Sequence, residues 1–127
     1  ARHGAFHPGA DERRFGADQR HCAVLRRGDL LRVFWTRVGD VPERIYVSTV
    51  DLRPDWMSWT ASEPVEVLRP ERPWEGADLP LVPSYRSAVN LPVNQIRDPA
   101  IYEEGGRVWL LYAVKGEGGL GIAELTL

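Results

Sequence analysis

The chain has 127 residues, enough for one domain with a buried core, and its composition (43% hydrophobic, 27% charged) is that of an ordinary globular protein. Its formal net charge of -2 argues against a surface for nucleic acid or anionic membrane. The single cysteine excludes an internal disulfide, and no apolar run is long enough to span a membrane. No signal peptide is recognisable, which leaves the localisation open.

Residues 1–20 show neither helical nor strand periodicity, and an irregular lead-in is expected there. From His21 on, short runs of β-branched and aromatic residues alternate with turn residues, which predicts a first meander of four strands. The predicted strands are 22–25, 30–36, 44–52 and an outer strand drawn from 56–60 and 64–68. Because no segment carries a sustained helical stripe, the sequence predicts an all-β protein.

A long proline-rich segment, 70–97, follows this meander. It holds too many apolar residues for simple disorder, and we expect an ordered loop packed over one face of the domain. A second strand-rich segment, 98–127, comes next. Its strand 108–114 is apolar on both faces, and such a strand must be covered on both faces.

The two strand-rich segments align with each other when His21 is set against Asp98, a shift of 77 residues. The shift matches turn glycines and apolar positions, and a two-residue gap in the following loop then sets 45–48 against 120–123. Chance similarity of two β-meanders is the competing interpretation. A repeated antiparallel meander is the unit of a β-propeller, which favours a true repeat.

We therefore predict two consecutive propeller blades, 21–69 and 98–127, of which the second has no outer strand. Two blades cannot close a ring, so the propeller is incomplete unless further chain or association of several copies completes it. The sequence favours neither solution.

Blade topology places the strand starts at His21 and Asp98 on the same face as the turns that carry Asp40 and Glu117. Pro99 favours extended backbone at the residue before it and would fix the direction of the Asp98 carboxylate. Asp98 is then either a cap that accepts backbone hydrogen bonds or an acid of a binding or active site. His21 is either hydrogen-bonded in the core or a ligand of water or metal.

The run Arg-Asp-Pro-Ala-Ile-Tyr-Glu-Glu-Gly-Gly-Arg at 97–107, followed by Trp-Leu-Leu-Tyr-Ala at 109–113, resembles a blade of the five-bladed propeller glycoside hydrolases. These are the arabinanase, xylosidase and fructosidase-like enzymes, and the resemblance covers about 21–68 and 95–126. In that superfamily an Arg-Asp-Pro at a blade start carries an acid of the sugar site. The resemblance implies that Asp98 stabilises the transition state or modulates the general acid, with Arg97 as its orienting partner.

The sequence departs from this family at the second acid. Glycoside hydrolysis needs two carboxylates, and the family places three on three blades, whereas here the equivalent position holds His21. Glu117 is the best second catalytic acid on the expected face, and Glu75 and Asp78 are weaker candidates. Each of these three is more readily explained as a solvated side chain than as a catalytic acid.

Side chains on and beside the long loop are the candidates for binding a sugar. With Arg97, the expected substrate-binding residues are Trp74, Arg86 and Gln95, and Tyr85, Asn90 and Asn94 lie near them in the sequence. Packing of the loop explains the two aromatic residues nearly as well. Cys22 and the strand aromatics are expected in the core; the latter are Trp35, Tyr46, Trp109 and Tyr112.

The expected function is that of a carbohydrate-active propeller that hydrolyses glycosidic bonds only when other blades complete it. The alternative is a non-catalytic carbohydrate-binding or assembly module. The expected partners are carbohydrate and, through self-association, further copies of the chain. No cofactor is certain; a divalent cation such as calcium, held by His21 in the central funnel, is the candidate.

Overall fold

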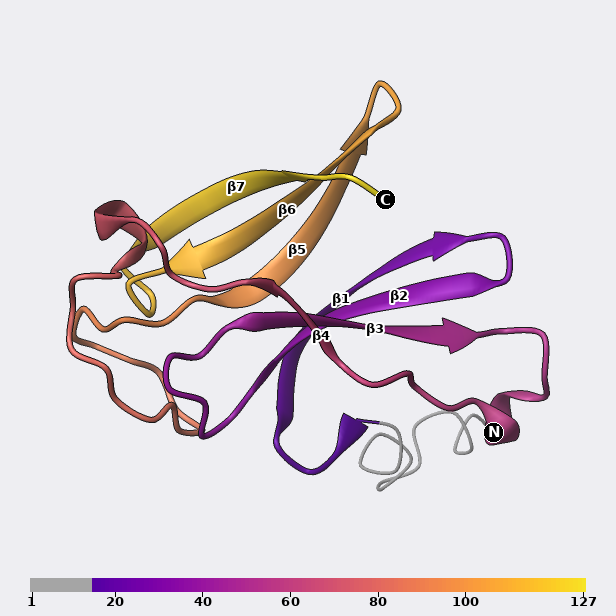
Figure 1. Ribbon diagram of the computed structural model, residues 1–127, viewed down its shortest axis with the longest axis horizontal. Helices are drawn as coiled ribbons and strands as arrows, with labels where there is room; N and C mark the ends of the chain where they lie inside the picture. The colour runs from indigo at the N-terminus through magenta and orange to yellow at the C-terminus, as the bar shows by residue number, and fades with distance from the viewer. Residues whose placement is uncertain (1–14) are drawn as a thin grey trace.

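The computed structural model describes residues 15–127, in which seven strands form two antiparallel sheets (Figure 1). The strands are β1 (Gln19–Arg27), β2 (Leu30–Arg37), β3 (Ile45–Asp51), β4 (Val65–Leu68), β5 (Arg97–Glu104), β6 (Arg107–Val114) and β7 (Gly119–Leu125). The prediction of an all-β protein is confirmed. Most of the expected irregular lead-in, 1–20, lies outside the described residues. Its last two residues already belong to β1, which begins at Gln19.

Strands that follow each other in the chain are neighbours in both sheets. Sheet A has the order β1-β2-β3-β4, and sheet B has the order β5-β6-β7. The prediction of a strand at 56–60 is wrong, because Trp56–Ser58 forms a 3-10 helix, η2. The carboxylate of Asp55 accepts a hydrogen bond from the Met57 N–H (3.0 Å), and an Asp in this position favours a helical turn over a strand.

The long loop between the sheets contains a second 3-10 helix, η3 (Pro73–Glu75), and lies against the turns at one end of both sheets (left in Figure 1). Three backbone hydrogen bonds fix it to the β2-β3 turn of sheet A: Gly39 N–H to the Ser84 carbonyl (3.0 Å), Ser84 N–H to the Asp40 carbonyl (3.2 Å) and Ile96 N–H to the Glu43 carbonyl (3.1 Å). On sheet B, the Lys115 N–H donates to the Glu75 carbonyl (2.9 Å). The loop is thus ordered by bonds to the same end at which β1 and β5 begin.

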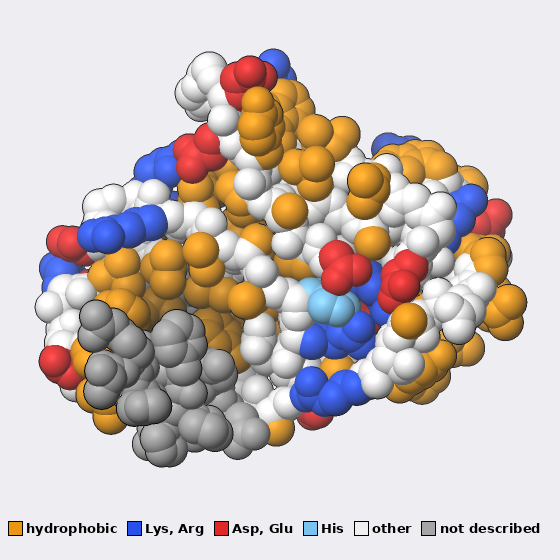
Figure 2. Space-filling model, turned by 180° about the vertical axis from the view of Figure 1, so that it is seen from behind, with side chains coloured by type: hydrophobic (Ala, Val, Ile, Leu, Met, Phe, Trp, Pro, Cys, Tyr) orange, Lys and Arg blue, Asp and Glu red, His pale blue; other side chains and the backbone are white. Residues whose placement is uncertain are grey.

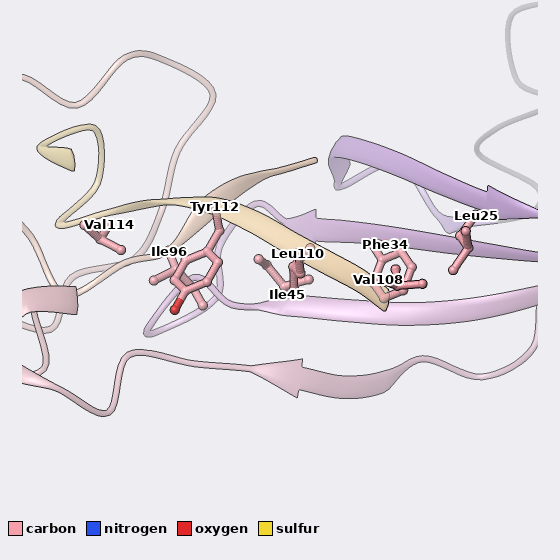
Figure 3. Packing of buried hydrophobic residues seen from close by; sticks show 8 residues of the cluster. All are labelled: Leu25, Phe34, Ile45, Ile96, Val108, Leu110, Tyr112 and Val114. Atoms are coloured by element: carbon pink, nitrogen blue, oxygen red, sulfur yellow. The ribbon is translucent and has the colours of Figure 1, made fainter. Parts of the chain in front are cut away.

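A hydrophobic core fills the space between the two sheets (Figure 3). Alternate residues of β6 supply its sheet B side, as the sequence pattern predicts. The buried members are Leu25, Phe34, Ile45, Ile96, Val108, Leu110, Tyr112 and Val114. A second cluster covers the other face of sheet A, where Val33, Trp35 and Val50 pack against partly buried residues that include Phe15 and Trp59.

Both meanders contain a β-bulge at the same place in their first strand. The extra residue is His21 in sheet A, and in sheet B the irregularity falls at Asp98 and Pro99. The backbone φ angles of His21 (46°) and Asp98 (52°) are both in the left-handed region. The prediction that Pro99 keeps Asp98 extended is therefore wrong, because the bulge demands a conformation that Asp and His tolerate better than most residues.

The bulge also bears on Cys22, which follows it. The expectation that Cys22 lies in the core is wrong, because this residue is exposed. It pairs with Trp35 across β1 and β2, but β1 is the edge strand of sheet A and leaves the cysteine side chain uncovered.

Candidate functional site

The two bulges bring His21 and Asp98 together although 77 residues separate them in the chain. The His21 Nε2 atom lies 3.2 Å from the Asp98 Oδ1 atom, and the Asp98 side chain is 48% exposed. The Arg20 Nη2 atom lies 2.8 Å from the same ring nitrogen. Figure 2 shows the pale-blue histidine at the surface with acidic and basic side chains beside it. We call the whole group the bulge cluster; its members are Arg20, His21, Glu43, Arg97, Asp98 and Glu117.

Glu43, in the turn between β2 and β3, lies at the centre of the bulge cluster and is fully buried. Its carboxylate oxygens are 3.2 Å from the Arg97 Nη2, 3.6 Å from the Arg20 Nε and 3.7 Å from the His21 Nδ1. These contacts are ion pairs by distance, but neither Glu43 oxygen makes a well-aligned hydrogen bond within the described chain. Charge attraction rather than directional bonding therefore holds this carboxylate.

The charge state of Glu43 follows from two opposing effects. Burial by itself would raise the pKa of Glu43, because it removes the charged form from water. Contacts with His21 and Thr36 and the positive charges of Arg97 and Arg20 act in the other direction and are stronger together. The pKa of Glu43 is consequently held below its usual value, and this carboxylate is ionised at neutral pH.

Arg97 has a different role from the one expected. The guanidinium is fully buried and forms an ion pair with Glu43, and its Nη1 lies 3.2 Å from the Glu117 Oε1. It also donates a hydrogen bond to the side-chain oxygen of Gln95. Arg97 therefore anchors two acids and the long loop, and the structure corrects the expectation that it orients Asp98, whose carboxylate instead contacts His21.

Several expected substrate-binding residues are engaged in holding the loop. Gln95 is fully buried, and its amide donates to the Val82 carbonyl (3.2 Å). Arg86 donates to the Ala17 carbonyl. Trp74 is half exposed on η3. Gln95 and Arg86 thus tie the loop to neighbouring segments, whereas Trp74 keeps an accessible ring.

The candidate second acids are placed very differently. Glu117 belongs to the bulge cluster and is 41% exposed, and its Oε1 also accepts from the Val89 N–H (3.3 Å). Glu75 is buried and accepts the Tyr112 O–H (2.8 Å). Burial, together with this contact with Glu75, raises the pKa of Tyr112. The structure thus corrects the suggestion of Glu75 as a catalytic acid, because it is a structural acceptor. Asp78 is exposed on the turn after η3.

A pocket of about 470 Å³ lies within the long loop, beside the bulge cluster. Tyr85, Asn90 and Gln95 line it together with apolar side chains. Gln95 lines this pocket and also accepts a hydrogen bond from Arg97, so one residue joins the pocket wall to the bulge cluster. Three of the residues that the sequence associates with sugar binding therefore share one cavity.

The residues around His21 do not fit a metal centre. Its Nε2 faces Asp98 and Arg20, and its Nδ1 lies 3.2 Å from the Thr36 hydroxyl. Within residues 15–127, no group of three His, Cys, Asp or Glu side chains has a geometry that could hold a metal ion. A positive guanidinium beside the ring also opposes a cation there, so the expectation of calcium held by His21 finds no support in this geometry.

Sequence reasoning missed Glu43 and Arg20. The repeat contains a signal for Arg20, since the shift that sets His21 on Asp98 also sets Arg20 on Arg97. Glu43 lies in the turn already assigned to the correct face through Asp40, but nothing in its immediate sequence marks it as buried. Asp40 itself accepts the Tyr46 O–H (2.6 Å), and burial together with this contact raises the pKa of Tyr46 to about 12.

Comparison with known proteins gives one informative relative. The chain is 44% identical over 107 residues, or 84% of its length, to an uncharacterized protein of Acanthamoeba polyphaga mimivirus. The matched segment is only 30% of that relative, so the chain spans less than a third of its length. No protein-family model and no solved structure matches the chain. Among the described residues, no helix has the length and apolar character needed to cross a bilayer.

Proposed function

We propose that the two sheets are neighbouring blades of a β-propeller and that the bulge cluster is part of a carbohydrate-active site. The observation that carries the proposal is the placement of Asp98. Its half-exposed carboxylate stands on a strained bulge at the start of a sheet, and the equivalent bulge residue His21 contacts it. Left-handed backbone at a non-glycine residue is a conformation that functional sites often retain.

The packing of the two meanders supports the propeller part. Both are consecutive antiparallel meanders, and their first strands, β1 and β5, lie against each other. The relative is more than three times as long as the matched segment, which leaves enough chain for the further blades that a closed ring requires. The resemblance of 97–107 to the five-bladed glycoside hydrolases agrees with this arrangement.

The electrostatics of the bulge cluster distinguish its three acids. Glu43 and Glu117 are both ion-paired with Arg97, whereas the Asp98 carboxylate contacts the His21 imidazole. A half-exposed carboxylate beside an imidazole can accept hydrogen bonds from sugar hydroxyls while the ring supplies or accepts another. Asp98 is therefore the residue expected to touch the sugar, and His21 is the residue that positions it.

Hydrolysis places a further demand that this chain meets only in part. Two carboxylates must flank the glycosidic bond, one of them as a proton donor. Because Glu117 is ion-paired with Arg97, we assign the stabilising role to Asp98 and leave the remaining acids to other blades. The ion pair between Glu117 and Arg97 also supports the second candidate, a non-catalytic carbohydrate-binding module built from the same blades.

Sugar binding by the 127-residue protein tests this proposal directly. Soluble oligosaccharides of several classes are titrated into wild type, Asp98→Asn and the control Asp29→Asn, an exposed acid in the turn between β1 and β2. Loss of a charged hydrogen bond predicts roughly 10- to 100-fold weaker binding for Asp98→Asn, and the control should bind as tightly as wild type. Absence of binding by wild type, or equal weakening by both variants, would contradict the proposal. Aryl-glycoside hydrolysis by the full-length relative, which has chain for further blades, separates the enzyme from the binding module.

A further inference from the structure

Sheet B carries an apolar outer face, on the side away from sheet A. The strand register places Tyr102, Leu111, Leu120 and Ile122 on this face, which we call the open face. Leu120 is 82% exposed, Ile122 is 58% exposed and Tyr102 is 50% exposed. Contiguous exposed apolar side chains of this size mark an interaction surface.

The register of the repeat shows what the open face corresponds to in sheet A. Phe34 pairs with Val47 across β2 and β3, and the matching pair across β6 and β7 is Leu111 with Ile122. The same correspondence relates Leu25 to Tyr102 and Ile45 to Leu120. The counterparts in sheet A are the buried residues Leu25, Phe34 and Ile45 and the partly buried Val47, and all four pack in the core against sheet B.

The opposite faces correspond in the same way. Trp35, on the outer side of sheet A, is the counterpart of Tyr112, which faces sheet A from sheet B. The inner face of sheet A thus packs on the face of sheet B that corresponds to the outer face of sheet A, an arrangement that we call head to tail. Head-to-tail packing repeats the same contact indefinitely or closes into a ring. By this rule, the open face is where a third sheet packs just as sheet B packs on sheet A.

A second copy of this chain is poorly suited to supply that third sheet. It would have to present the outer face of its sheet A, where Trp35 and Val33 lie. Phe15 and Trp59 already pack on that face, and Trp35 is only 2% exposed. A second copy would therefore have to displace Phe15 and Trp59 from that face, which disfavours head-to-tail stacking of copies.

In at least one protein this segment is part of a longer polypeptide, since 70% of the length of the relative lies outside the match. We infer that the open face binds a further antiparallel β-sheet with an apolar face, supplied by additional polypeptide of the same chain as in the longer relative, and not by a second copy. The inference shares the blade architecture with the proposed function, but it does not depend on the sugar site.

The test compares one pair of substitutions in two proteins. Leu120→Glu with Ile122→Glu is made in the 127-residue protein, and the residues at the same two β7 positions are changed to Glu in the full-length mimivirus protein. Thermal unfolding and sedimentation are measured for both. The matched control is Val24→Glu with Val65→Glu, two exposed positions of sheet A (56% and 63%).

We expect the short protein to be monomeric and its thermal midpoint to be unaffected by either pair. In the full-length relative, the β7 pair should lower the midpoint by at least about 5 °C, because it buries charge between two sheets. An unchanged midpoint there would overturn the inference. A wild-type dimer of the short protein that the β7 pair dissociates would also overturn it, because the occupant would then be a second copy. Sugar binding through Asp98 can fail without affecting either outcome.

Discussion

The first three strands of sheet A pair in the same order and register as the three strands of sheet B, but equivalent residues differ in burial. Ile45 of sheet A is completely buried, whereas its counterpart Leu120 in sheet B is 82% exposed. Both are large aliphatic residues in the third strand of a meander. The difference lies in the neighbour, since sheet B covers Ile45 while the open face has no covering segment among the described residues. Burial is thus a property of the assembly of sheets, not of the repeat.

The two bulges, in contrast, show the same backbone structure in both sheets although the side chains differ. His21 and Asp98 adopt nearly the same backbone φ, and the arginine before each extends toward Glu43. Local structure is therefore conserved between the repeats even where the side chain changes from imidazole to carboxylate. What the change alters is charge, which turns two equivalent positions into a complementary pair.

The largest expected effect concerns the two arginines that precede the bulges. Arg97→Met removes a fully buried guanidinium and leaves Glu43 without its closest cation, at a cost of about 3–5 kcal/mol. Arg20→Met affects a partly exposed side chain that is 3.6 Å from the same carboxylate, and a cost of about 1 kcal/mol is expected. Urea denaturation measures both. Equal costs would contradict this expectation and show that Arg20 and Arg97 stabilise Glu43 to the same extent.

A second comparison uses the aliphatic counterparts. Ile45→Ala should destabilise the protein by about 2–5 kcal/mol, because it leaves a cavity between the sheets. Leu120→Ala should change the free energy of unfolding by less than about 0.5 kcal/mol in the 127-residue protein. A large loss of stability for Leu120→Ala would mean that the open face is covered in solution.

The smallest effect is the pH dependence that Glu43 contributes. Its pKa is lower in the folded protein than in the unfolded chain, so its stabilising contribution is complete above its ordinary carboxyl pKa. The contribution is lost as the pH falls through the lowered folded value. Glu43→Gln should therefore flatten the fall in stability on the acid side of pH 5, measured by denaturation at a series of pH values. Glu71→Gln, at an exposed loop residue, serves as the control and should leave the profile unchanged.

Much of the fold could be predicted from the sequence because its signals are local. Runs of β-branched and aromatic residues predict most of the strands. Because β6 is apolar on both faces, its pattern does not predict which set of its side chains faces sheet A. Failures occur where a local rule meets a competing one. The Asp55 cap replaces a predicted strand by η2, and the bulge overrides the preference that Pro99 imposes on Asp98.

The candidate site was less predictable, because its central residue is defined by contacts over long sequence distances. Arg97 and Gln95 are candidate sugar ligands by residue type, but the sequence does not show that both are fully buried and hydrogen-bonded to each other. Glu43 carries no motif, and only the meeting of three basic groups from β1 and β5 shows its role.

The periodicity and the turn residues of the chain specify the all-β class, the two meanders and the equivalence of His21 with Asp98. Three features arise only when the sheets pack: the contact between these two residues, the ion pairs of Arg97 with Glu43 and Glu117, and the apolar face of sheet B that stays exposed. The physical reason is that packing and ion pairing depend on which surfaces meet, and a strand pattern specifies an apolar face without specifying its partner.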